Sequence, residues 1–274
     1  MSVPYRPRIL EAKNAEGNLP RYKLGPKLKT GKDSVPDGGS DADVSLRTCC
    51  LKSGPISKAS GSAYVEFGNT KVIASVFGPH AKRFGRANSD FTLGSGSLNC
   101  EVRFAPFARS DDSGDTERDA EGVGMTPEEH WLTENLVQSL AASIQLHRFP
   151  KSVLDVNVYI LEDDGSAQAV ATTCASLALV DSGVELYDIV AGCNVADCDG
   201  RLVVDPNKQQ LDTADGYVSM ALMPNHSKLT QFEVNGSFSV SRLGEVSSLG
   251  YNGCSTVARI MRDEAISAGR KHWA

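Results

Sequence analysis

The 274-residue sequence predicts an α+β protein, in which β-sheets are packed with a few helices. Three observations favour this class. Segments rich in Val, Ile, Tyr and Phe cluster before residue 108 and again between residues 187 and 238. Two helical segments, separated by one long alternating strand, lie between these β-rich parts, and a further helical segment follows them. No repeat with a period of roughly 20 to 50 residues is present.

The first β-rich part begins near Val44. A two-residue turn at Gly68-Asn69 joins its second and third strands. The polar loop that follows the third strand carries Lys82, Arg83 and Arg86, and a strongly acidic loop follows the fourth strand. The predicted strands cover residues 46–54, 60–68, 70–79 and 98–107.

The middle of the chain alternates between helix and strand. Thr126-Pro127-Glu128-Glu129 has the spacing of a capping box with Pro at the first helical position, which predicts a helix ending near His147-Arg148. Residues 152–162 alternate as a strand. Ser166 is a candidate cap for a small-residue helix over 167–183, with Gly183 as its C-terminal glycine.

The last part predicts four strands and a helix. Asp199-Gly200 and Pro224-Asn225 supply turns between strands. The final helical segment, 241–271, contains Gly250 and Gly253, which predict one break. The predicted strands cover residues 187–196, 201–205, 216–224 and 229–238.

Composition predicts a soluble intracellular protein. With 41% hydrophobic residues, a chain of this length can bury about three quarters of its unfolded surface without a metal or disulfide. No apolar run approaches the roughly 18 residues of a membrane span, and the first residues lack a signal-peptide layout. The seven cysteines form no CxxC pair, so we expect reduced core residues rather than a zinc site.

Residues 1–43 read as an irregular, basic N-terminal arm, and residues 44–274 as a single domain. Residues 1–33 carry eight basic and three acidic side chains, so the remainder of this chain of net charge −6 carries −11. Such an arm fits a polyanion, an acidic partner, or simply a solvated tail.

Three groups of polar residues are candidates for chemistry. The turn Glu162–Ser166 precedes a helix, whose N-terminus can hold phosphate, but its three carboxylates favour an ordinary strand–helix turn. Asp205 and Asp212 could bind magnesium or act as acid and base, although the intervening residues favour an exposed turn. The third group could converge on a nucleic-acid backbone or be ordinary surface charge. It consists of Lys82, Arg83, Arg86, Arg103 and Arg109.

Several segments together resemble the RNase PH family over about residues 44–268: GSAYVEFGNTKVIASVFGP, CEVRFAPFARS, LDVNVYILEDDGSAQAVATTCASLALVDSGVELYDIVAG and GYVSMALMP. The resemblance implies an RNase PH-like fold of the ribosomal-protein-S5-domain-2 type. It also implies a place in a six-membered ring of RNase PH-like exosome subunits with S1/KH-type cap proteins, processing RNA from its 3′ end in the nucleus, nucleolus and cytoplasm, without a cofactor.

The family's catalytic motifs are degenerate here. Active members carry a Gly-Thr-Arg turn that binds the attacking phosphate; the matching residues are Gly165, Ser166 and Ala167. A second phosphate-binding Arg corresponds to Met125. In active members, two Asp six residues apart supply acid and metal chemistry. Asp205 matches the first, whereas the position six residues on is Leu211 and Asp212 lies one further, so the second Asp is displaced or lost.

These departures predict a catalytically silent ring subunit, because phosphoryl transfer depends on positive charge around the phosphate. The acidic loop 110–121 adds repulsion. An alternative is an active phosphorolytic 3′-to-5′ exoribonuclease that borrows an Arg from a partner. A third possibility is a hydrolytic nuclease that uses Asp205 and Asp212 with magnesium.

Overall fold

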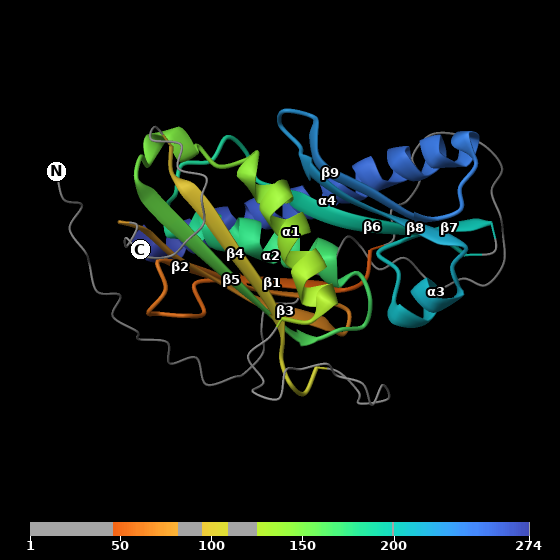
Figure 1. Ribbon diagram of the computed structural model, residues 1–274, viewed down its shortest axis with the longest axis horizontal. Coiled ribbons are helices and arrows are strands. Elements are labelled where there is room, and N and C mark those ends of the chain that lie inside the picture. Colours follow the sequence, from red (N-terminus) through yellow and green to blue (C-terminus); the bar gives the residue numbers. More distant parts are fainter. Residues whose placement is uncertain (1–45, 82–94, 109–124, 199, 274) are drawn as a thin grey trace.

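The computed structural model describes residues 46–81, 95–108, 125–198 and 200–273, which form two sheets with helices between and beside them (Figure 1). This arrangement confirms the predicted α+β class. The five-stranded sheet has the order β1-β2-β3-β5-β4, and the four-stranded sheet has the order β7-β6-β8-β9. The strands are β1 Cys49–Ser53, β2 Gly61–Phe67, β3 Thr70–Ala81, β4 Ser97–Phe104, β5 Ser152–Glu162, β6 Ala191–Cys198, β7 Arg201–Val204, β8 Gly216–Met223 and β9 Lys228–Gly236.

Helix α1 (Pro127–Ala141) begins as the sequence predicts. The Thr126 side chain accepts from the Glu129 N–H, and the Glu129 carboxylate accepts from the Thr126 N–H, which completes the capping box. The helix ends earlier than residues 147–148. Ile144 leaves the helix to form an isolated β-bridge with Leu186, and only a short 3-10 turn, Leu146–Arg148, follows.

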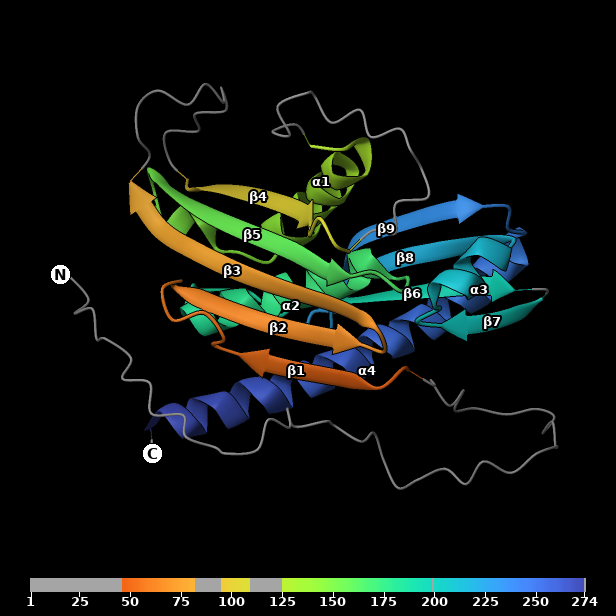
Figure 2. The same ribbon diagram turned by 90° about the horizontal axis from the view of Figure 1, so that it is seen from below.

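Helix α2 (Ala167–Ser182) forms the centre of the molecule, in contact with strands of both sheets (Figure 2). Its small side chains allow close approach, and two strand glycines make the approach possible. A Cβ on Gly61 would lie 2.3 Å from the Ser182 backbone nitrogen, and one on Gly192 would lie 2.5 Å from the Ala169 carbonyl oxygen. Its C-terminal Gly183 has φ +72°, as expected for a helix-terminating glycine.

Helix α4 (Val240–Trp273) runs without interruption, so the predicted break near Gly250–Gly253 is wrong. These glycines serve packing. A Cβ on Gly250 would lie 2.3 Å from Met220 Sδ, and one on Gly253 would lie 2.6 Å from Cys193 Sγ. The helix contacts β6 and β8 of one sheet and β1 of the other, so it joins the two sheets (Figure 2).

A short helix, α3 (Lys208–Thr213), replaces the exposed turn that the sequence predicts after β7. Asn207 and Gln210 form a second capping box, with reciprocal bonds of 2.8 and 2.9 Å. Asp205 and Pro206, which precede it, are buried. Within the described ranges, no helix is both long and apolar enough to cross a membrane.

Candidate functional site

Three segments that are far apart in the sequence meet beside the N-terminus of α2. They are Arg47 ahead of β1, the turn Asp163–Ser166 between β5 and α2, and residues Asp205–Lys208 between β7 and α3. This junction contains most of the positions that the family resemblance assigns to phosphate and metal chemistry.

The turn before α2 is fixed from both sides. The Thr70 hydroxyl donates to the Gly165 carbonyl oxygen at 2.8 Å and accepts from the Asp164 N–H at 3.1 Å. On the other side, the Lys208 N–H donates to the Asp164 carbonyl oxygen at 3.0 Å. Gly165 has φ +88°, and a Cβ there would lie 2.7 Å from the backbone of Asn207. Only glycine fits this position, and backbone from the second sheet closes against it.

Ser166 does not cap α2, contrary to the sequence prediction. It adopts a left-handed conformation with φ +59°, and its side chain makes no cap hydrogen bond. Its hydroxyl instead donates to the Pro206 carbonyl oxygen at 2.9 Å, and the residue is only 3% exposed. The hydroxyl that matches the family's Thr is therefore bonded to the protein's own backbone, and Ala167 beside it carries no charge.

Arg47 and Asp205 form the electrostatic centre of the junction. Arg47 Nε donates to Asp205 Oδ2 at 2.8 Å, and Nη2 donates to Oδ1 at 2.6 Å, which is a two-pronged ion pair. The same guanidinium donates to the carbonyl oxygens of Asp164 and Gly165 at 3.1 and 3.3 Å. Asp205 is 4% exposed and its φ of +54° is unusual for a residue with a side chain.

The second phosphate-binding position, Met125, precedes α1. A helix N-terminus attracts anions, but here the protein supplies its own. The buried Glu129 carboxylate accepts N–H bonds from Thr126 and from Phe104, both at 2.9 Å. This carboxylate belongs to the first turn of α1, and the neighbouring Met125 side chain carries no charge.

The burial of Asp205 and the exposure of Asp212 do not support the hypothesis that these two carboxylates act together. Asp205 is buried and bound to Arg47, whereas Asp212 lies exposed on α3 and Leu211 is half-buried. Across the part of the chain that the structure describes, no group of three His, Cys, Asp or Glu side chains could hold a metal ion.

A buried amide beside the junction is unsatisfied by the described residues. Gln168, in the first turn of α2, is 6% exposed, and among the described residues neither its amide nitrogen nor its amide oxygen has a hydrogen-bond partner. Buried amides normally find partners, so this side chain could receive a polar ligand.

Of the predicted RNA-binding residues, only Arg103 is described; Lys82, Arg83, Arg86 and Arg109 lie outside the described residues. Arg103 Nε donates to Glu101 Oε1 at 2.8 Å on the outer face of β4. Ala81 and Ser97, which flank the first basic loop, pair with neighbouring residues at the start of β5, whereas Arg103 pairs with Tyr159 near its end. Six residues of strand, about 20 Å, therefore separate Arg103 from Ser97.

Sequence reasoning missed Arg47 and Thr70, which hold the junction together. Both lie in or beside predicted strands, and nothing in their local pattern marks a contact with residues about 95 to 158 positions away. Helix α3 did carry a signal, because Asn207 and Gln210 have capping-box spacing.

Comparison with known proteins places the chain in a family. Residues 45–185 match domain 1 of the 3′ exoribonuclease family, RNase PH, and residues 188–253 match its domain 2. The two matched parts correspond to the five-stranded sheet with α1 and α2, and to the four-stranded sheet with the first part of α4.

Individual relatives agree with that match. The chain is 35% identical to "Exosome complex component RRP41-like" of Arabidopsis thaliana over 230 residues, covering 84% of this chain and 83% of the relative. It is 32% identical to "Exosome complex component MTR3" of Homo sapiens over 267 residues, covering 93% and 95%. The crystal structure of rice (Oryza sativa) Rrp46 superposes with a TM-score of 0.69 at 19% identity, covering 81% of this chain and 96% of that one, which supports the fold.

Proposed function

The chain belongs to the 3′ exoribonuclease (RNase PH) family, and on that premise we propose that it is a non-catalytic ring subunit of an RNA exosome core. In this role it supports assembly and the threading of RNA for 3′-to-5′ processing, including that of ribosomal RNA, and decay. Relatives named as exosome complex components over more than four fifths of the chain support the assembly part of the proposal.

The main observation in favour of an inactive subunit is that the Arg47 guanidinium is already bound within the protein. Phosphorolysis brings inorganic phosphate against an RNA phosphodiester, so the site must offset several negative charges. The guanidinium bound at the junction belongs to Arg47, and the carboxylate of the buried Asp205 balances its charge. Met125 and Ala167 occupy the two family Arg positions without charge.

The test is release of nucleoside diphosphates from RNA in phosphate buffer by the purified chain. We expect no phosphate-dependent release above that of a sample without protein. Phosphate-dependent release that Asp205→Asn abolishes and the exposed Asp212→Asn preserves would overturn the proposal. An active RNase PH-family enzyme assayed in parallel confirms that the RNA is a competent substrate.

The unpartnered Gln168 favours one rival, an active phosphorolytic subunit. In that reading its buried amide contacts phosphate at the uncapped start of α2, and a partner subunit supplies the missing arginine. The same assay on the assembled complex separates the two. A complex that releases diphosphates and loses this activity on Gln168→Ala, with assembly intact, would favour the rival.

Assembly is supported by an apolar edge on the second sheet. Strand β9 lies at the end of the strand order, and three of its large apolar side chains are substantially exposed: Leu229 at 52%, and Phe232 and Val234 at 40% each. An edge strand with such side chains is suited to pairing with another chain. We propose that related RNase PH-like subunits cover this edge in a six-membered ring with S1/KH-type caps.

The assembly test compares the wild type with Phe232→Glu/Val234→Glu in co-expression with candidate ring partners. Size-exclusion chromatography should place the wild type in a large complex and the double variant mostly outside it. Lys228→Ala, an exposed polar change on the same strand, is the matched control and should assemble normally. A double variant that assembles like the wild type would exclude this edge as the contact.

The proposed cellular sites are the nucleus, including the nucleolus, and the cytoplasm, where exosome substrates are processed. Fractionation should recover the chain in both compartments within the large complex. Confinement to one compartment would contradict that part of the proposal.

A further inference from the structure

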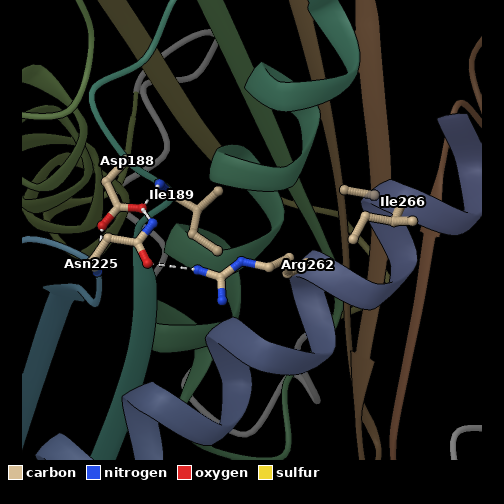
Figure 3. A pocket seen from close by; sticks show the side chains of 6 residues that line it. Asp188, Ile189, Asn225, Arg262 and Ile266 are labelled. Atoms are coloured by element: carbon tan, nitrogen blue, oxygen red, sulfur yellow. Dashed lines mark hydrogen bonds between the residues drawn. The ribbon is translucent and has the colours of Figure 1, made fainter.

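A pocket of about 280 Å³ is lined by none of the residues of the candidate phosphate site. It is formed by the second half of α4, the chain just before β6 and the turn between β8 and β9 (Figure 3). Its apolar lining consists of Ile189, Ala265 and Ile266, and its polar lining of Asp188, Asn225 and Arg262. This volume lies just below the roughly 300 to 1,000 Å³ of small-molecule sites, so the pocket suits one or two side chains.

The polar side chains of the pocket are connected by a chain of hydrogen bonds. The buried Asp188 carboxylate accepts from the Asn225 N–H at 2.7 Å, the Asn225 side-chain amide at 2.9 Å and the Ile189 N–H at 2.9 Å. These bonds leave the Asn225 amide oxygen pointing to Arg262, whose Nη2 donates to it at 3.0 Å. The guanidinium is therefore held in place by a chain of hydrogen bonds that ends in a buried carboxylate (Figure 3).

The acceptor of Arg262 is a neutral amide, so its positive charge has no carboxylate in direct contact. No ion pair of Arg262 occurs among the residues with described positions, and only one of its five N–H donors is used. Three other arginines of the described residues, Arg47, Arg148 and Arg242, each bind a carboxylate. Arg262 combines a hydrogen bond to Asn225, unused donors and a charge that no carboxylate contacts directly, beside apolar side chains.

We propose that this pocket, the Arg262 pocket, docks a segment of a partner protein that carries an acidic side chain next to an aliphatic one. The carboxylate binds the guanidinium, and the aliphatic side chain packs between Ile189 and Ile266, which is 48% exposed. A chain-terminal carboxylate fits less well, because such groups are held by backbone N–H groups. The two lining N–H groups, of Ile189 and Asn225, already donate to Asp188.

The test uses the full chain in the assembly in which it purifies, labelled at isoleucine methyl groups for NMR. The probe is the capped peptide acetyl-Gly-Glu-Leu-Gly-amide, and its matched control replaces Glu by Gln. We expect the Glu peptide to shift the Ile189 and Ile266 methyl signals saturably, and the Gln peptide to bind about tenfold more weakly, because a charge-assisted hydrogen bond is lost.

Two variants make the result specific. Arg262→Met keeps the apolar stem, removes the charge, and should abolish the difference between the peptides. Arg259→Met, an exposed change one turn earlier on α4, should preserve it. Three outcomes would each overturn the proposal: equal binding of both peptides, absence of a saturable shift, or an Arg262→Met variant that retains the full difference between the peptides. The readout involves no RNA and no catalysis, so it is independent of the proposed function.

Discussion

Arg47 and Asp205 are 158 residues apart in the sequence, and two N–H···O bonds of 2.8 and 2.6 Å join their side chains. The pair connects the start of the first sheet to the end of β7 in the second. Because Arg47 also binds the carbonyl oxygens of Asp164 and Gly165, it holds the turn before α2 in the same contact. In this chain, Asp205, which the sequence resemblance matches to a catalytic aspartate, is bonded within the fold.

Removing the arginine should therefore destabilise the protein. Arg47→Met leaves Asp205 buried at 4% exposure without its partner, and breaking a buried pair in this way costs about 3 to 5 kcal/mol. Because the Arg47 side chain is 18% exposed, we expect a loss near the lower end of that range. Equilibrium urea unfolding measures it. The exposed Lys208→Met should change the free energy of unfolding by less than about 0.5 kcal/mol, and a similarly small effect of Arg47→Met would contradict the role of the pair.

The glycines of α4 give a second prediction, because two of them have opposite surroundings. Gly253→Ala should destabilise by about 1 to 3 kcal/mol, since its Cβ would lie 2.6 Å from Cys193 Sγ and 3.2 Å from Val204. Gly244→Ala in the same helix meets no atom within 4 Å and should stabilise by up to about 1 kcal/mol. Thermal unfolding of both variants checks the contrast. Equal shifts in one direction would mean that helix propensity alone governs these positions.

The contrast between these glycines illustrates which features of the fold could be predicted from the sequence and which could not. Strand positions and the Thr126 capping box depend on neighbours within a few residues, and they were predicted correctly. The break at Gly250–Gly253 was wrong because local reasoning treats glycine as a helix breaker. The reason for these glycines is contact with Met220 and Cys193, which the sequence places about 30 and 60 residues away.

The residues of the candidate site likewise include some that the sequence predicted and some that it did not. Family resemblance pointed to Met125, Ala167 and Asp205 by position alone. It did not provide Arg47, because ion pairs across 158 residues leave no local pattern. The burial of Asp205 was also missed, since a Pro followed by polar residues is typical of an exposed turn.

A third prediction concerns thiol reactivity. Six of the seven cysteines are buried, and Cys198 is partly buried. Burial raises the pKa of Cys49 to about 11 and that of Cys100 to about 12, so at pH 8 only about one in a thousand Cys49 side chains is a thiolate. A chromogenic disulfide reagent should show one fast thiol at pH 8, lost in Cys198→Ser. Several fast thiols in the folded wild type would contradict the packing.

The same thiols also predict a pH dependence. Because these pKa values are raised, each unit of rising pH below the pKa should increase the thiolate fraction about tenfold and speed the slow reactions in proportion. Slow phases that are independent of pH between 7 and 9 would instead report local unfolding as the limiting step.

The last prediction concerns RNA. Arg103 lies on β4 about 20 Å along the strand from Ser97, where that strand begins. If one RNA strand runs along this edge, the Arg103 guanidinium contacts its phosphates. Contacts to a single-stranded backbone are independent of sequence and weaken with salt, with a log–log slope of about −0.7 per phosphate neutralised.

We therefore expect Arg103→Ala/Arg109→Ala to weaken RNA binding by the reconstituted ring and to make the salt slope shallower by about 0.7 to 1.4, with assembly unchanged. The Glu101 partner of Arg103 opposes this, because a guanidinium that already binds a carboxylate gains less from phosphate. Glu101→Gln separates the two effects: it should strengthen binding if Arg103 reaches RNA and leave it unchanged if Arg103 only binds Glu101. Superimposable salt series for the wild type, the double variant and Glu101→Gln would assign these arginines to surface charge and leave the subunit an architectural role.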